Sequence, residues 1–203
     1  RARLGPVIRE VLVEDATEHL SPGGAGTRAS LLKAGHDVLV SRGYHGTRVD
    51  DIAAAAGVSH GAFYRYFDNK DHLIRLLAAQ AIRTVSMTLA AIPDSAVTGP
   101  SGSAALRRWL RRYDTTNAAE AAMIGVWVDA TADDPSLSVE SGAALDWARA
   151  RMARFLAPRG FGDVDAEALV MVALLDAFGA RRRDASMIDA AVHIIQRGLL
   201  GHP

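Results

Sequence analysis

The sequence predicts an all-α fold. Apolar residues recur at helical spacing along nearly the whole chain of 203 residues, and no segment alternates apolar and polar residues as a half-buried strand does. Apolar residues make up 49% of the chain and prolines number only 7, so the composition supports a packed core and not a disordered chain. A chain of this length suits one large domain or two small ones.

The N-terminal segment is predicted to contain two helices separated by a break. Residues 4–20 have a short apolar stripe, which predicts an amphipathic helix. The sequence SPGGAG at 21–26 is expected to be a flexible break. Thr27 can cap the next helix, and Gly43 is well placed to end it.

Two short helices are expected to follow around a tight turn. Thr47 and Asp50 have the spacing of a capping box, which opens a helix that runs through the alanines before Gly57. Gly57 permits a sharp turn because it has no β-carbon, and Ser59 can cap a second helix over 60–67.

The remainder of the chain is predicted to be helical around one linker. Asn69 can cap a long helix that ends near Ile92, and the residues PDSAVTGPSGS at 93–103 have the composition of a linker. Further helices are expected over about 103–117, 118–132, 136–157, 165–182 and 185–200.

Charge is distributed unevenly although the formal net charge is zero. Between Thr27 and Arg83 eight basic residues face five acidic ones, a net +3, whereas from Thr84 onward twelve face fourteen, a net −2. A modestly basic module followed by a neutral to acidic body fits a DNA-binding head on a domain that does not bind DNA. The chain has no cysteine, which excludes disulfides and cysteine-ligated zinc.

Residues 47–73 have the pattern of a helix–turn–helix, whose second helix fits the DNA major groove. Its small core is expected to be Val49, Ile52, Ala53, Val58, Phe63 and Phe67. The exposed side of the second helix is expected to carry His60, Gly61, Tyr64, Arg65 and Tyr66. His60 can offer a donor to a base edge, and Ala62 can contact a thymine methyl. Alternatively, any helical hairpin with a glycine turn and core aromatics would give a similar pattern without reading DNA.

A longer set of residues makes the pattern more specific. The set comprises Gly43-Tyr44, Thr47, Asp51-Ile52-Ala53, Ala56-Gly57-Val58-Ser59, Gly61, Phe63-Tyr64, Tyr66-Phe67, Asn69-Lys70 and Leu73. On these residues the stretch 28–77 resembles the TetR (tetracycline-repressor type) family of transcriptional regulators. Two positions depart from the family pattern: Arg48 replaces a common threonine and Ala62 replaces a small hydroxyl residue, which leaves the operator sequence open.

The resemblance implies a set of DNA contacts. Bases would be met by His60, Gly61, Ala62 and Tyr64, and phosphates by Arg48, Arg65, Tyr66 and Lys70. We expect a DNA-binding domain at 27–75 and a helical ligand-binding and dimerisation domain at 76–203. Residues 1–26, which lie ahead of the usual start of the motif, are expected to form an extra helix and linker, with the tail of an upstream domain as the alternative for the first part.

The resemblance also implies a body that binds a small molecule and dimerises through its last two helices. Those helices are strongly apolar over more than one face, which favours cover by a partner chain, although packing within the chain is the alternative. Large apolar side chains that could line a ligand cavity are Trp109, Tyr113, Met123, Trp127, Trp147, Met152, Phe155 and Phe178.

No catalytic, metal-binding or cofactor motif supports an enzyme. The seven histidines form no H-E-x-x-H pair, and no P-loop or G-x-S-x-G sequence occurs. No apolar run approaches a membrane span, so we expect a cytoplasmic protein with no membrane partner. The sequence therefore predicts a homodimeric repressor released from a palindromic DNA operator by a small molecule. The alternative is a helical protein-interaction or small-molecule-binding module without operator recognition.

Overall fold

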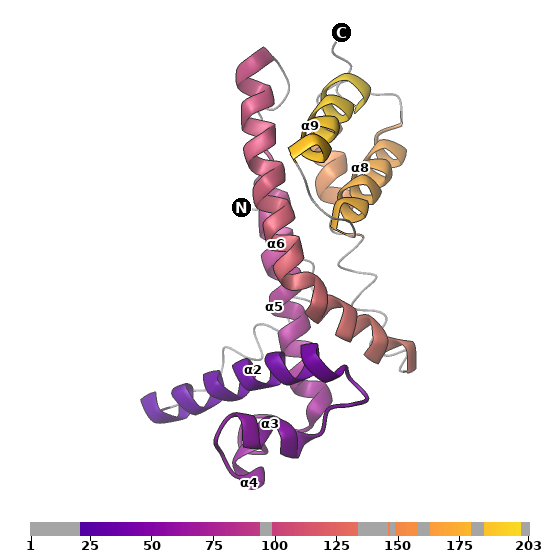
Figure 1. The fold of residues 1–203 in the computed structure, drawn as a ribbon. Coiled ribbons are helices and arrows are strands. Elements are labelled where there is room, and N and C mark those ends of the chain that lie inside the picture. Colours follow the sequence, from indigo (N-terminus) through magenta and orange to yellow (C-terminus); the bar gives the residue numbers. More distant parts are fainter. Residues whose placement is uncertain are drawn as a thin grey trace. The chain divides into compact units, whose positions relative to one another are not determined.

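Helices account for most of the residues that the computed structural model describes, which are 21–93, 99–133, 146, 149–157, 163–179 and 185–199 (Figure 1). No strand occurs among these residues, so the all-α prediction is confirmed. The helices are α2 (Pro22–Arg42), α3 (Val49–Ala55), α4 (His60–Phe63), α5 (Lys70–Ala90), α6 (Gly99–Asp133), α8 (Val164–Gly179) and α9 (Ala185–His193), which a π-helical turn (Ile194–Leu199) extends. The helix predicted at 4–20 lies outside the described residues.

Helix α2 begins five residues before the predicted start at Thr27, so the expectation of a flexible break is wrong. Ser21 is the N-cap, and its hydroxyl accepts a hydrogen bond from the Gly24 N–H at 3.2 Å. Pro22 occupies the first helical position, where its fixed φ angle and missing N–H are tolerated. Thr27 lies inside the helix and donates its hydroxyl to the Gly23 carbonyl at 3.0 Å. The Ser-Pro start signal therefore outweighs the glycines that follow it.

Helix α3 is capped one residue later than predicted. Arg48 is the N-cap, and its backbone N–H donates to the Asp51 carboxylate at 3.0 Å, so the capping role expected of Asp50 belongs to Asp51. Thr47 is only 2% exposed and donates its hydroxyl to the Gly43 carbonyl at 2.8 Å. That bond to the end of α2 leaves the Thr47 side chain unavailable as a cap.

The other predicted turn signals are confirmed. Gly43 ends α2 and Gly57 turns the chain after α3, with positive φ angles of 72° and 70° that side chains with a β-carbon rarely adopt. Ser59 accepts from the Ala62 N–H at 3.3 Å, and Asn69 accepts from the His72 N–H at 2.7 Å. Helix α4 is shorter than the predicted 60–67 and passes into turns after Phe63.

Helix α6 is continuous where two helices and part of a linker were predicted. Its 35 residues begin at Gly99, four residues before the predicted start of the first of the two expected helices. The polar sequence around Thr115 contains no proline or glycine, and the Thr115 hydroxyl bonds to the Arg111 carbonyl at 2.9 Å inside the helix. Nothing in that stretch therefore ends the helix.

The chain forms two compact units, each with its own core. Among the described residues the head unit comprises 21–83 and 120–133, and the body unit comprises the rest. The head core gathers α2, α3, α4, the first part of α5 and the end of α6; its most buried large side chains include Leu31, Leu39, Ile52, Phe63, Phe67, Leu73, Ile74, Met123 and Trp127. The body core includes Leu106, Trp109, Leu110, Met152, Phe155, Met171, Leu175 and Ile195. A domain boundary after residue 75 stays a prediction.

Among the described residues one helix, α5, is long and apolar enough to cross a membrane when only length and composition are considered, contrary to the expectation that no apolar run approaches that length. Of its most apolar window, 56% is buried inside the protein. Leu73, Ile74, Leu76 and Leu77 lie in the head core, which explains the apolar composition without a membrane.

Candidate nucleic-acid interface

The turn between α3 and α4 is fixed by backbone hydrogen bonds and a packed apolar core. The Val58 N–H donates to the Ala53 carbonyl at 3.0 Å, and the Gly57 N–H donates to the Ala54 carbonyl at 3.1 Å. The predicted core residues are buried, with Ile52 and Phe63 at 0% exposure, and Val49 and Val58 pack against them half-buried. The packing and the hydrogen bonds hold the short helix α4 against α3.

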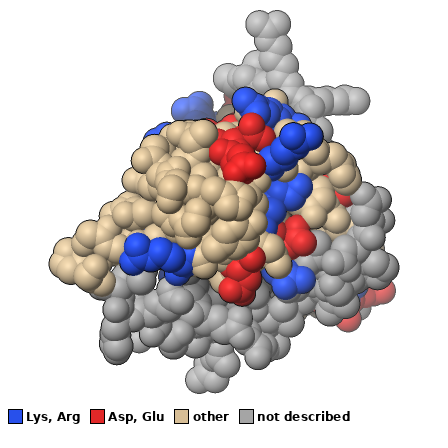
Figure 2. Space-filling model, turned by 90° about the horizontal axis from the view of Figure 1, so that it is seen from below, with Lys and Arg blue, Asp and Glu red and all other residues tan. Residues whose placement is uncertain are grey.

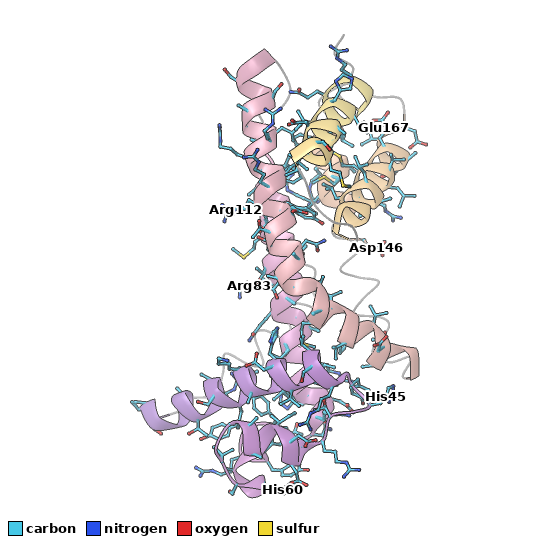
Figure 3. All side chains as sticks on the ribbon, in the orientation of Figure 1. His45, His60, Arg83, Arg112, Asp146 and Glu167 are labelled. Carbon is cyan, nitrogen blue, oxygen red and sulfur yellow. The ribbon has the colours of Figure 1, made fainter. Side chains whose placement is uncertain are left out.

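Helix α4 presents small and polar side chains to solvent. His60, Gly61 and Tyr64 are exposed, the last with 49% of its surface accessible, and Ala62 is half-buried. A β-carbon added at Gly61 would meet no atom within 4 Å, so the helix backbone is open to an approaching molecule. Three of the four predicted base-contacting residues therefore lie exposed at one end of the head, where His60 marks α4 in Figure 3.

His60 is held by side chains of both helices. Its Nδ1 is hydrogen-bonded to the Asp50 carboxylate on α3, and its ring lies 5.1 Å from the Tyr64 ring at an interplanar angle of 55°. Sequence reasoning did not identify Asp50 as a partner of His60, since the two are ten residues apart and on different helices.

The predicted phosphate contacts differ in accessibility. Arg48 and Arg65 are exposed, and the Arg65 guanidinium lies 6.0 Å from the Tyr66 ring centre. Tyr66 was expected on the exposed side of α4, and this expectation is wrong, since it is only 9% exposed and belongs to the head core. The chain leaves the helical path after Phe63, which turns the Tyr66 ring inward beside Phe67.

Lys70, at the first turn of α5, is held in a defined position. Its ammonium donates to the carbonyls of Tyr44 at 2.7 Å and Thr47 at 3.1 Å, and lies 3.8 Å from the centre of the Tyr44 ring. The Tyr44 hydroxyl donates to the Asp71 carboxylate at 2.6 Å, which holds the ring in place. Burial lowers the pKa of Lys70, while the nearby Asp71 raises it. An ammonium has three hydrogens, so two carbonyls leave one for a further acceptor such as a phosphate oxygen.

Charges of both signs are interspersed on this end of the molecule. Figure 2 shows Lys and Arg side chains next to Asp and Glu instead of one continuous basic patch. Arg42 pairs with Asp51 at 2.8 Å, and Lys33 pairs with Asp37 at 2.7 Å. A surface of mixed charge attracts a polyanion less than a continuous basic patch does, so any binding of nucleic acid here would depend more on shape and on individual contacts.

The helix–turn–helix and its flanking helices match a known protein family. The family model described as "Bacterial regulatory proteins, tetR family" matches residues 31–77. Over these residues the head of the chain is similar to the TetR family. The resemblance noted in the sequence is thereby confirmed.

Curated transcriptional repressors match the head of the chain. The HTH-type transcriptional repressor DhaR of a Mycobacterium species is 38% identical over 66 residues, which are 30% of this chain and 33% of DhaR. The HTH-type transcriptional repressor KstR2 of Rhodococcus jostii is 38% identical over 52 residues, 26% of each protein. The chain thus spans about a quarter to a third of the length of the curated relatives it matches.

The fold of a TetR-family regulator extends over most of the chain. The crystal structure of PfmR from Thermus thermophilus superposes with a TM-score of 0.63, 19% identity, and coverage of 83% of this chain and 98% of PfmR. At this level of identity the similarity concerns the fold alone.

The predicted pocket residues fall into two cores. Trp109, Tyr113, Met152 and Phe155 are buried together in the body core. Met123 and Trp127 lie instead in the head core. Trp147 and the side chain of Phe178 lie outside the described residues. In the body core, the Trp109 indole N–H donates to the Thr88 carbonyl at 2.9 Å, and its ring stacks on Tyr113 at 5.7 Å.

Proposed function

We propose that the protein is a transcriptional repressor that binds a palindromic DNA operator as a homodimer and is released by a small molecule. The match of residues 31–77 to the TetR family model supports the proposal, and so does the exposed surface of α4. The observation that carries it is the surface of α4, which has an open backbone at Gly61 and exposed side chains at His60 and Tyr64. A helix of this kind can enter the major groove and bring its N-terminal residues to base edges.

We propose His60, Gly61, Ala62 and Tyr64 as the base-contacting residues. Phosphate contacts would come from the exposed Arg48 and Arg65 and from the third hydrogen of the Lys70 ammonium. Phosphate contacts orient a protein on DNA without selecting sequence, whereas base contacts select it. The two sets therefore predict separable effects of mutation.

Dimerisation is proposed through α8 and α9. Leu169 and Val170 on α8 are 52% and 55% exposed, and Ile194 directly after α9 is 48% exposed. Large apolar side chains exposed on neighbouring positions of a helix favour cover by another surface. A second copy of the chain would supply that cover and would present two recognition helices to a two-fold symmetric operator.

We place the effector in the body, where Trp109, Tyr113, Met152 and Phe155 share one core. Aromatic and sulfur-containing side chains line apolar ligand sites, so the effector is expected to be largely apolar. Such a regulator acts on DNA in the cytoplasm and needs no catalytic activity.

The test is a selection from random duplex DNA, followed by binding assays over a range of salt concentrations. The wild-type protein is expected to enrich a palindrome and to lose affinity as salt rises. Tyr64→Ala should weaken binding to the enriched sequence more than to random DNA. Arg65→Ala should weaken both and lower the salt slope by about one. Arg108→Ala removes an exposed arginine from α6 and serves as the control.

Failure to enrich any palindrome would refute the proposal. Equal binding by wild type and the Tyr64→Ala variant would instead show that α4 is not the DNA-reading element.

A further inference from the structure

Three exposed side chains form a cluster where α3 meets the start of α4. The Asp50 carboxylate binds the Nδ1 atom of His60, and the Tyr64 ring lies against the His60 ring. The side chain of Asp50 is 74% exposed and that of His60 is 57% exposed. The cluster therefore lies on the surface of the head that would face DNA in the proposed function. The bond to Asp50 and the contact with the Tyr64 ring restrict rotation of the imidazole.

The Asp50 carboxylate determines which nitrogen of His60 carries the hydrogen. An ionised carboxylate can only accept hydrogen bonds, so Nδ1 must be the donor. A neutral imidazole has one donor and one acceptor nitrogen, and Nε2 is then the acceptor. Among the residues that the structure describes, none bonds to Nε2, which lies on the side of the ring away from Asp50.

Base edges in the major groove differ in the groups they offer to such an acceptor. Adenine N6 and cytosine N4 carry amino donors, whereas guanine N7 and O6 and thymine O4 are acceptors. We propose that Asp50 is a positioning residue that fixes the tautomer of His60, so that Nε2 accepts a hydrogen bond from an adenine or cytosine amino group in each half-site. The sequence alone had favoured a donor role for His60, and the bond to Asp50 gives the neutral ring the opposite polarity. The inference rests on the proposed function, because it requires α4 to lie in the major groove.

Asp50 has two other effects that the test must separate from positioning. It lies in the first turn of α3, where a carboxylate stabilises the helix dipole, and it adds negative charge near the phosphates. Both effects alter stability or affinity for all sequences alike, whereas a fixed tautomer alters the preference for one base. The head offers a matched control in the exposed Asp68, 3.4 Å from the His72 ring nitrogen and 89% exposed.

The experiment compares sequence selections by wild type, His60→Ala, Asp50→Ala, Asp50→Asn and Asp68→Ala. They are run at one pH, about 8, because the inference concerns the neutral form of the imidazole. Wild type is expected to prefer one base about three- to tenfold at one position of each half-site. The His60→Ala and Asp50→Ala variants are both expected to lose this preference. Asp50→Asn should weaken that preference while it keeps affinity, because an amide can accept from or donate to Nδ1 and thus permits both tautomers. Asp68→Ala should match wild type, and thermal melting of each variant reports any loss of folding.

Duplexes with altered bases then identify the hydrogen-bond donor. At the base position whose preference His60→Ala abolishes, the adenine or cytosine amino group is removed from the duplex. This removal should weaken wild-type binding by the same roughly three- to tenfold factor as the lost preference. It should leave the affinity of the His60→Ala variant unchanged. An unchanged preference in Asp50→Ala, or a requirement for the guanine or thymine acceptor instead of the amino group, would overturn the inference while the proposed function stands. If wild type enriches no sequence at all, the proposed function and this inference both fail.

Discussion

Substitution of Gly61 by alanine separates folding from DNA binding. A β-carbon at this position would meet no protein atom within 4 Å, and its backbone does not have the positive φ angle that makes a side chain costly. The added methyl therefore disturbs nothing inside the protein. It projects from α4 into the space between the helix backbone and an approaching base.

The magnitude of each effect follows from this geometry. Glycine is less favourable than alanine in a helix interior by about 0.8–1.0 kcal/mol, and Gly61 lies near the start of a helix of 4 residues, so we expect a gain in stability of about 0.5 kcal/mol. For a protein of this size that gain raises the Tm by about 1–2 °C. If the backbone of α4 approaches the bases, the methyl should weaken operator binding at least tenfold, or about 1.4 kcal/mol.

Gly125 on α6 provides the control, because a β-carbon there also meets nothing within 4 Å. Gly125→Ala lies deep in a helix and should gain up to about 1 kcal/mol of stability without any change in DNA affinity. Thermal melting and fluorescence anisotropy with a labelled operator measure both variants. Operator affinity of Gly61→Ala equal to that of Gly125→Ala would refute close approach of the α4 backbone to DNA.

Further substitutions test the turn, the cap and the dimer surface. Gly57→Ala should destabilise the protein by about 1–2 kcal/mol in urea unfolding, because Gly57 has a φ angle of 70°; an unchanged unfolding midpoint would contradict this. The pKa of the Asp51 carboxyl is held below its ordinary value, chiefly because the Arg48 backbone N–H donates to the carboxylate. The stability that this bond contributes is therefore complete at a pH above the ordinary carboxyl pKa. This stability is lost as the pH falls through the lowered pKa of the folded protein. In the Asp51→Asn variant the free energy of unfolding should therefore fall less steeply as the pH is lowered. A fall as steep as in wild type would count against a contribution from the bond between the Arg48 N–H and Asp51. Leu169→Glu should convert the dimer to a monomer, as measured by light scattering. The control Val128→Glu, which changes a side chain 53% exposed on α6, should leave the dimer intact. A Leu169→Glu protein that is still a dimer would exclude α8 from the interface.

The sequence predicted those parts of the head in which neighbouring residues determine the structure. Ser59 and Asn69 cap helices through side chains that reach backbone groups three residues away, and Gly57 supplies a conformation that few other residues adopt. Such signals are contained in short windows, and the family pattern of the motif added the order of the helices.

The errors arose where two local signals compete or where distant residues meet. At Ser21-Pro22 a start signal competes with a glycine-rich sequence, and the start signal prevails. Thr47 has the side chain of a cap but bonds to the end of α2 instead. Helical periodicity placed Tyr66 outside, whereas the helix ends at Phe63 and the chain turns the ring into the core.

The sequence did not predict the contacts that hold side chains of the candidate interface in position. The Lys70 ammonium meets carbonyls 26 and 23 residues away, and backbone carbonyls have no sequence signature. The candidate pocket residues, similarly, were grouped by type, and only the fold separates the head core around Trp127 from the body core around Trp109.

Chemical protection of the selected operator tests the central claim, that paired α4 helices read the major groove, most directly. Methylation by dimethyl sulfate reports guanine N7 in the major groove and adenine N3 in the minor groove. Two protected major-groove segments are expected, about one helical turn (~34–36 Å) or a multiple of it apart. In the Tyr64→Ala variant this protection should be lost at equal occupancy of the operator. Protection confined to the minor groove, or a single segment without a symmetric partner, would contradict the claim.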